Sequence, residues 1–177
     1  GHGLLARRIG AARPLAALER RAFGVPVASW LVLEDLRPAP DAVSVLAGGA
    51  ADADAVCDAL ARLAIALHRA GVDHGDLKGT HVFLVRRDGA LAPALIDLEG
   101  VRFVRRPSEA RRIRALAQLN ASLPDALPDA LRCRAFARYA AALPFARGRA
   151  AALREVVAAS LARRHRWSGA GCAEAER

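Results

Sequence analysis

The chain has 177 residues, of which 54% are hydrophobic and 25% charged, a composition that fits one globular domain and excludes an intrinsically disordered segment. Lys and Arg number 27 against 18 Asp and Glu, a formal net charge of +9, and no run of 18 or more apolar residues predicts a membrane-spanning helix. Because the chain contains no Met and starts Gly1-His2-Gly3, we expect further residues before Gly1.

The first part of the chain predicts a β-hairpin that runs out into a connector. Apolar segments at 14–20 and 26–33 are typical of strands, and the Phe23-Gly24 pair between them favours a tight turn. Residues 1–9 indicate the end of a helix. After the second strand, the Glu-Asp-Leu triplet at 34–36 precedes two prolines, which interrupt regular structure.

The centre of the chain predicts a long amphipathic helix followed by two polar loops and a hairpin between them. The helix is expected over 52–70, because apolar residues recur there at helical spacing on one face: Val56, Leu60, Leu63 and Leu67. A polar loop follows at 72–81. Short strands at 82–86 and 91–96 then form a hairpin that leads into the acidic segment Asp97-Leu98-Glu99-Gly100.

The remaining sequence predicts three helices and a tail. We expect helices from Ser108 to about 119, from 128 or 129 to about 143, and from about 149 to 164. The small and polar residues 167–177 indicate a loose tail.

The densest cluster of reactive side chains lies in the two polar loops: His74, Asp76, Lys78, His81 and Asp97. A hairpin returns the chain close to its start, so Asp97 is expected beside the 74–81 loop. Phosphoryl transfer needs a carboxylate for the acceptor hydroxyl, a cation for the phosphates and fixed ligands for a divalent metal. The sequence has no nucleophile elbow, CxxC, HExxH or GxGxxG pattern that favours another chemistry.

The segments HGDLKGTHVFLV and LIDLEGVRF resemble the catalytic loop and the metal-binding loop of protein-kinase-like folds, whose usual pattern is H-R-D-L-K-x-x-N followed by D-F-G. The variant is most similar to the lipopolysaccharide core kinases, the Kdo and heptose kinases, in its His at the Asn position and in the Arg-rich RRIRALAQLNASL that follows. The similarity runs from about residue 10 to about residue 143.

This resemblance implies an α+β fold, namely a kinase-like C-terminal lobe that is mainly helical, with a small catalytic β-hairpin. Residues 1–36 would be a remnant of the N-terminal lobe with its last hairpin, residues 37–166 the helical lobe, and 167–177 the loose tail. The glycine-rich loop and the lysine of a complete N-terminal lobe are not expected in residues 1–13.

The resemblance also implies roles for single residues. Asp76 corresponds to the catalytic aspartate, which accepts the proton of the acceptor hydroxyl, and Lys78 to the lysine that contacts the transferred phosphate. Asp97 corresponds to the principal metal-binding aspartate and His81 to the second metal ligand. His74 would brace the loop.

The resemblance further implies a nucleotide and a metal. The backbone of Glu34, Asp35 and Leu36 would form the hinge that holds the adenine ring of ATP. The metal would be Mg²⁺, with Mn²⁺ as an alternative because His81 is a softer ligand than Mg²⁺ prefers.

The implied function is ATP-dependent phosphorylation of a sugar hydroxyl in the lipopolysaccharide core. Gly75 stands where Arg is usual and no long activation segment follows Asp97, which favours a small molecule or glycan over a protein substrate. Two alternatives remain open. One is a pseudokinase or binding module that lacks the phosphate-binding strands, and the other is a small-molecule kinase of the aminoglycoside or choline type, which usually has Asn at the position of His81.

The basic residues consist of 26 Arg and one Lys and are concentrated after the second polar loop and near the C-terminus: Arg102, Arg105, Arg106, Arg111, Arg112, Arg114, Arg163, Arg164 and Arg166. They indicate either a solvated face or a site for an anionic partner, such as the lipid A and core glycolipid or the acidic inner face of the inner membrane, which implies a cytoplasmic location. Nucleic acid is not expected, since only 5% of residues are aromatic.

Overall fold

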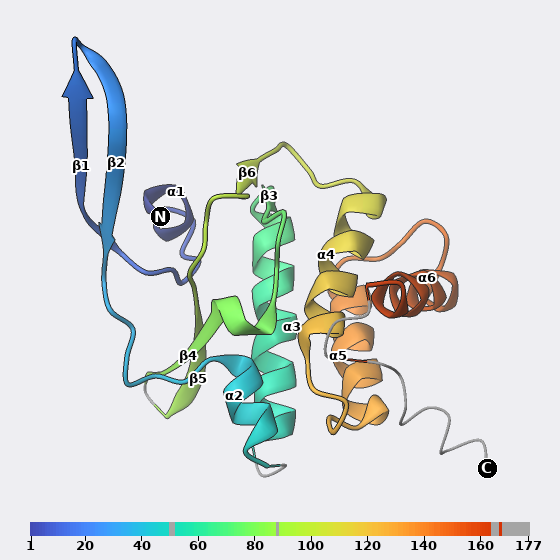
Figure 1. Ribbon diagram of the computed structural model, residues 1–177. Coiled ribbons are helices and arrows are strands. Elements are labelled where there is room, and N and C mark those ends of the chain that lie inside the picture. Colours follow the sequence, from blue (N-terminus) through green and yellow to red (C-terminus); the bar gives the residue numbers. More distant parts are fainter. Residues whose placement is uncertain (50–51, 88, 164–166, 168–177) are drawn as a thin grey trace.

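The computed structural model describes residues 1–49, 52–87, 89–163 and 167, and it has three parts (Figure 1). A long hairpin projects from one end, a set of helices forms the body, and a smaller hairpin lies between them. The expected α+β class with a mainly helical body is therefore confirmed.

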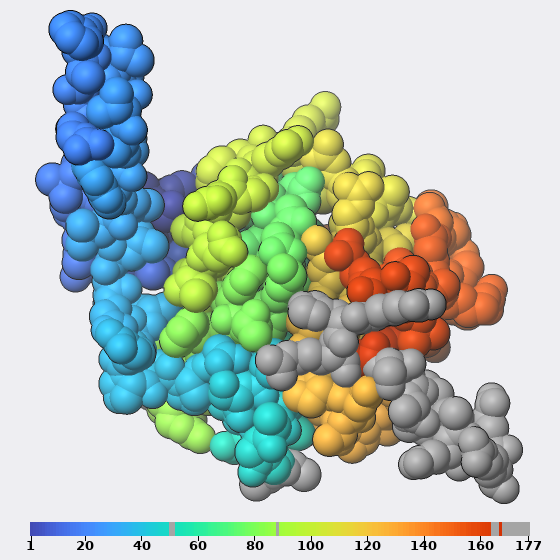
Figure 2. All heavy atoms as spheres, viewed as in Figure 1, coloured from blue at the N-terminus to red at the C-terminus, as the bar shows by residue number. Residues whose placement is uncertain are grey.

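The projecting hairpin consists of β1 (Pro14–Ala22) and β2 (Val25–Leu33), which pair in antiparallel register. Phe23 and Gly24 both have positive φ, 51° and 81°, as a two-residue hairpin turn of this hand requires. Figure 2 shows the hairpin standing clear of the rest of the molecule. Large apolar side chains are accordingly exposed along it: Leu15, Leu18, Phe23, Val25, Val27, Trp30, Leu31 and Val32.

A short segment joins this hairpin to the body. Helix α1 covers only His2–Leu5, so the expected helical end over 1–9 is shorter than predicted. The chain then pairs with the smaller hairpin, where Leu95 N donates to Gly10 O and Ala12 N donates to Leu95 O, each at 2.9 Å. Gly10 and Ala12 thereby fix the base of the long hairpin.

The connector after β2 contains a helix that was not predicted from the sequence, α2 (Ala42–Ala47). Asp41 begins it, because its carboxylate accepts hydrogen bonds from Val43 N and Ser44 N. Pro38 and Pro40 therefore interrupt regular structure only as far as residue 40, and the cap at Asp41 allows a new helix to begin directly afterwards.

Helix α3 (Ala53–Arg69) is the central helix, and its predicted apolar face is buried as expected. It packs against α5 (Asp129–Ala142), while α4 (Glu109–Ser122) packs against α6 (Arg149–Leu161). Helix α4 begins after the Ser108 cap, as predicted, but ends three residues later than expected. The predicted end of the last helix, at 164, lies outside the described residues.

Two small sheets complete the fold. Strands β4 (Val82–Arg87) and β5 (Ala90–Leu95) form the predicted hairpin. Strands β3 (Val72–Asp73) and β6 (Arg102–Phe103) form a two-residue ladder. The first lies in the segment that was expected to be a loop, and no strand was predicted at the second. Such short pairing has no hydrophobic alternation that a sequence pattern could reveal.

The last described residue, Trp167, is 3% exposed. Its backbone N–H donates to Ala121 O at 3.1 Å, and the Arg132 guanidinium lies 5.0 Å from the centre of its ring. The rest of the predicted tail, 168–177, lies outside the described residues. Within the part of the chain that the structure describes, no helix is long and apolar enough to cross a membrane.

Candidate active site

Strand pairing on both sides holds the two polar loops next to each other. At one end Val72 pairs with Phe103, and at the other Val82 pairs with Leu95. The backbone bond from Ile96 N to His81 O, at 3.0 Å, extends the second pairing into the loops. The loops are thus the two sides of one interrupted antiparallel ribbon, which is why Asp97 returns to the 74–81 loop.

Two glycines allow these loops to approach closely. Gly75 has a φ of 79°, and a Cβ atom there would lie 2.7 Å from the carbonyl oxygen of Gly100. A Cβ atom on Gly100 would lie 2.8 Å from the carbonyl oxygen of His74. Both contacts are with backbone, so a side chain at either position would push the loops apart. The close approach of the loops therefore requires glycine at position 75.

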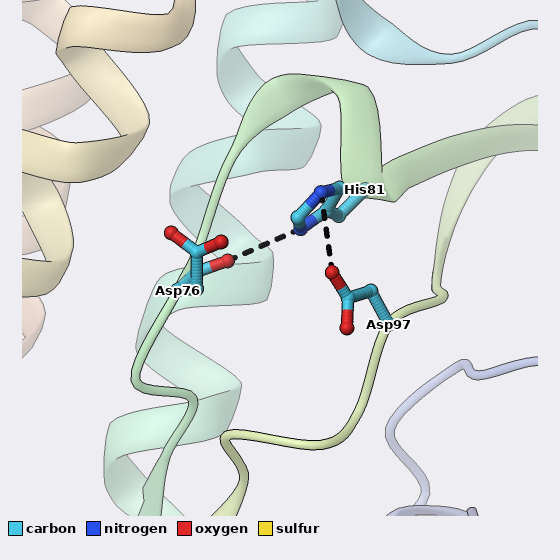
Figure 3. Close-up of side chains that lie close together, drawn as sticks. All are labelled: Asp76, His81 and Asp97. Atoms are coloured by element: carbon cyan, nitrogen blue, oxygen red, sulfur yellow. Dashed lines mark hydrogen bonds and ion pairs between the residues drawn. The ribbon is translucent and has the colours of Figure 1, made fainter.

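Asp76, His81 and Asp97 converge where the loops meet, with His81 between the two carboxylates (Figure 3). One possible ligand atom from each residue lies within 4.8 Å of the other two. His81 Nε2 is 3.5 Å from Asp97 Oδ2, and His81 Nδ1 is 3.2 Å from the backbone oxygen of Asp76. The side chain of His81 is 16% exposed, against 45% for Asp97.

The hydrogen bond at Nδ1 defines what His81 presents to Asp97. A carbonyl oxygen only accepts, so the network assigns the proton to Nδ1. In the neutral ring Nε2 then directs a lone pair towards the Asp97 carboxylate. Two lone-pair donors that face each other repel unless a proton or a metal ion lies between them. This donor set therefore fits a divalent metal ion.

Lys78 and Asp76 form an ion pair at the open side of the cluster. Lys78 Nζ lies 2.6 Å from Asp76 Oδ2, and the two side chains are 31% and 42% exposed. Asp76 Oδ1 has no partner among the described residues. The arrangement places an accessible carboxylate oxygen next to a fixed positive charge.

Asp97 itself adopts a left-handed backbone conformation, with a φ of 52°. Few residues other than glycine adopt it, and aspartate is among the more tolerant of them. Backbone of this kind is concentrated at functional sites, where the surrounding structure fixes it. Here the pairing of β4 with β5 and the Gly75–Gly100 contact fix it.

Two residues of α4 that were not predicted from the sequence support the 74–81 loop. Gln118 Nε2 donates to Gly75 O at 2.8 Å, and Ser122 Oγ accepts from Gly79 N at 2.8 Å. Both side chains are buried. They are four residues apart and so share a helix face, and two polar residues at that spacing in an apolar face were the available signal.

His74 lies beneath the loop and is 1% exposed. Burial lowers the pKa of its imidazole, and the nearby His81 acts in the same direction. Neither ring nitrogen has a hydrogen-bond partner among the described residues. His74 is therefore packed as a neutral ring, which fits the bracing role expected of it.

The predicted hinge residues lie apart from this cluster. Glu34 N donates to Arg13 O at 2.8 Å, and Glu34 and Leu36 line a separate cavity of about 540 Å³ against α3 and β5. The side-chain hydrogen bond from Arg37 lowers the pKa of Asp35 to about 2. The role of residues 34–36 in binding adenine stays a prediction.

The arginines after the second loop do not form one uniform face. Arg112 is structural, because its guanidinium donates to the Tyr139 hydroxyl at 2.9 Å and to the carbonyl oxygens of Leu143 and Pro144. Arg111 pairs with Asp73 at 3.0 Å. The others in this group are exposed: Arg102, Arg105, Arg106 and Arg114. Arg163 is also exposed, while Arg164 and Arg166 lie outside the described residues.

Comparison with known proteins identifies the family. The model of the lipopolysaccharide kinase (Kdo/WaaP) family matches residues 2–138. Among solved structures, WaaP in complex with acyl carrier protein is similar, with a TM-score of 0.71 and 22% identity over 90% of this chain and 71% of that chain, which shows a shared fold. No curated protein matches. The family model spans well over half of the sequence, so the chain belongs to the lipopolysaccharide kinase (Kdo/WaaP) family.

Proposed function

We propose that this chain carries the catalytic centre of an ATP-dependent kinase that phosphorylates a sugar hydroxyl of the lipopolysaccharide core. The observation that carries the proposal is the convergence of Asp76, His81 and Asp97, with Lys78 paired to Asp76. Membership of a lipopolysaccharide kinase family supports the reaction class and the acceptor class.

Asp76 is the residue that activates the acceptor. Its free Oδ1 atom accepts a hydrogen bond from the attacking hydroxyl, orients the oxygen and takes its proton as the new bond to phosphorus forms. Lys78 holds the other carboxylate oxygen at 2.6 Å, and its remaining ammonium protons are directed to the transferred phosphate. The proton and the phosphate charge thus have separate, adjacent partners.

His81 and Asp97 would hold the divalent ion, through Nε2 and the carboxylate. When bound, the ion supplies positive charge that offsets the charge on the triphosphate. Mg²⁺ prefers oxygen ligands and Mn²⁺ accepts imidazole readily, so the imidazole of His81 favours use of Mn²⁺ beside Mg²⁺. The 34–36 segment would hold the adenine ring through its backbone.

The acceptor would be a lipopolysaccharide core or lipid A glycolipid, reached at the cytoplasmic face of the inner membrane. The formal charge of +9 and the exposed Arg105 and Arg106 support a peripheral contact with an anionic surface. His81 at the position of the usual Asn favours this acceptor class over the small substrates of aminoglycoside and choline kinases.

A non-catalytic binding module is the second candidate. The observation in its favour is that Lys78 is the sole lysine of the sequence, so no other lysine of this chain is available to bind the nucleotide phosphates. A module of this kind would keep the fold and the basic surface without phosphate transfer.

Transfer of the γ-phosphate of radiolabelled ATP to a Kdo-containing core acceptor, with Mg²⁺ or Mn²⁺, tests the proposal. Asp76→Asn and Asp97→Asn should each lower the rate at least about a hundredfold, while circular dichroism and the melting temperature stay close to those of the parent chain. Asp54→Asn, on an exposed part of α3, is the matched control and should leave the rate unchanged.

Each other result has a definite meaning. Full transfer by both loop variants would refute the catalytic assignment. Absence of both transfer and metal-dependent ATP binding in the parent chain would favour the non-catalytic module.

A further inference from the structure

A cavity that is not lined by any of residues 34–36 lies next to Asp76. It has a volume of about 320 Å³ and lies between the catalytic loop, the segment around β6 and α4. Asp76, Gly75 and Gly100 line it, next to the close contact of the two loops. A molecule in this cavity therefore lies beside Asp76.

Helix α4 forms one wall of the cavity with a single face. The residues that it contributes are spaced by three, four and seven positions from the first, as one helix face requires: Arg111, Arg114, Ala115 and Gln118. Gln118 ties the helix to the catalytic loop through Gly75 O. Arg114 is exposed and lines the cavity beside the small side chain of Ala115.

The charges around this cavity do not balance. Its two carboxylates are already paired, Asp73 with Arg111 at 3.0 Å and Asp76 with Lys78 at 2.6 Å. Arg102 faces the same cavity from β6 and Arg114 from α4. Within the described ranges, neither of these two makes an ion pair. The cavity thus keeps two guanidinium groups that have no anion.

We propose that Arg102 and Arg114 bind an anionic group of the acceptor, a sugar carboxylate or phosphate, while a neighbouring hydroxyl of the same molecule reaches Asp76. This inference rests on the proposed kinase function, because the role of Asp76 makes the cavity an acceptor site. Guanidinium groups suit the task, since each offers paired N–H donors to two oxygens of one anion. A neutral sugar would leave both cations unpaired.

The arrangement assigns separate tasks to neighbouring arginines. Arg102 and Arg114 select the acceptor. Arg111 is committed to Asp73 and keeps that carboxylate from competing for the bound anion. Arg105 and Arg106 are exposed but do not line the cavity, which makes them matched controls of equal charge.

Binding measurements without nucleotide test the proposal on the purified chain. Isothermal calorimetry would compare Kdo, which carries a carboxylate, glucose 6-phosphate, which carries a phosphate, and methyl glucoside, which carries neither. Arg102→Gln and Arg114→Gln should each weaken the preferred anionic sugar about tenfold, and Arg105→Gln and Arg106→Gln should change it less than twofold. The sugar that binds more tightly identifies the anion as carboxylate or phosphate.

Three results would overturn the proposal. They are equal affinity for methyl glucoside, unchanged affinity in both cavity variants, or equal losses in all four variants, which would indicate only a diffuse positive field. No ATP or metal is present in these assays, so loss of the kinase proposal leaves the binding result intact. Conversely, transfer activity that ignores Arg102 and Arg114 would refute this inference alone.

Discussion

Two histidine-centred clusters in this molecule use similar groups in opposite ways. In the helical body, His68 Nδ1 lies 2.6 Å from the Tyr139 hydroxyl, which also accepts from Arg112 Nε at 2.9 Å. At the loops, His81 stands between carboxylates that are 42% and 45% exposed. In the first cluster the polar groups form hydrogen bonds with one another and so stabilise the fold. The second leaves carboxylate oxygens exposed to solvent, where a ligand could reach them.

Burial explains the electrostatics of the first cluster. Desolvation lowers the pKa of His68 to about 4 and raises that of Tyr139 to about 12. His68 is therefore neutral at pH 7. The Tyr139 hydroxyl accepts from Arg112 and so donates its own proton to His68, which closes the network.

The largest expected effect comes from separating the two loops that hold the His81 cluster. Gly75→Ala places a Cβ atom 2.7 Å from Gly100 O in a backbone with φ 79°. Strain and overlap together should destabilise the fold by about 4 kcal/mol, and transfer activity should fall with them. Urea unfolding and the phosphate-transfer assay measure the two.

Gly24→Ala is the control for this variant. Gly24 has a similar φ of 81°, but nothing lies within 4 Å of the position of its Cβ. Only backbone strain remains there, so the loss should be about 1 kcal/mol. Equal losses at Gly75 and Gly24 would show that the loop contact is unimportant.

The second expected effect is a pH dependence of the unfolding free energy that originates in the cluster of His68, Tyr139 and Arg112. As pH falls below 6.5, His68 gains a proton in the unfolded chain but stays neutral in the folded chain until about pH 4. The unfolded state binds more protons, so stability decreases with falling pH, by at most about 3 kcal/mol from this residue.

Urea unfolding between pH 4 and pH 7 checks this, with His68→Gln as the comparison. His74 contributes in the same direction, because burial lowers its pKa too. The pH slope of the variant should be smaller but not zero. A slope identical to that of the parent chain would show that His68 does not control it.

The third effect comes from removing the hydroxyl group at the centre of the His68, Tyr139 and Arg112 cluster. Tyr139→Phe removes the hydroxyl that joins His68 to Arg112 and leaves a buried ring nitrogen without its partner. The expected cost is about 2 kcal/mol of unfolding free energy, with metal and anion binding unchanged. Altered binding would instead mean that the two clusters are coupled.

The smallest effect tests what His81 contributes to the cluster that it forms with Asp76 and Asp97. His81→Asn replaces an imidazole with an amide oxygen, the donor that Mg²⁺ prefers. Affinity for Mg²⁺ should rise relative to Mn²⁺ by about fivefold, which is ~1 kcal/mol. Metal titration of nucleotide binding measures the ratio, and an unchanged ratio would exclude His81 as a ligand.

Much of this fold follows from local patterns in the sequence. The apolar face of α3 and the Ser108 cap of α4 predicted helices correctly, because helical spacing and capping act over a few residues. The Phe23-Gly24 turn predicted the long hairpin for the same reason. The hairpin between the polar loops also implied that Asp97 would return to Asp76.

The remaining features depend on contacts between distant segments. The pairing of β3 with β6 joins residues 29 and 31 positions apart through two residues of each strand, and the approach of Gly75 to Gly100 is a backbone contact. Neither leaves a periodic signal. The division of the arginines into structural, paired and free groups likewise depends on where Asp73 and Tyr139 lie. Helix α2 is different, since the Asp41 cap was visible beside the prolines.

The bare projecting hairpin has a practical consequence for spectroscopy. The chain has two indoles: Trp30 on that hairpin is 52% exposed, and Trp167 is 3% exposed. An aqueous quencher such as acrylamide reaches the first and not the second. Fluorescence recorded with and without quencher therefore distinguishes a change in the environment of the projecting hairpin from partial unfolding of the helical body, with no added dye.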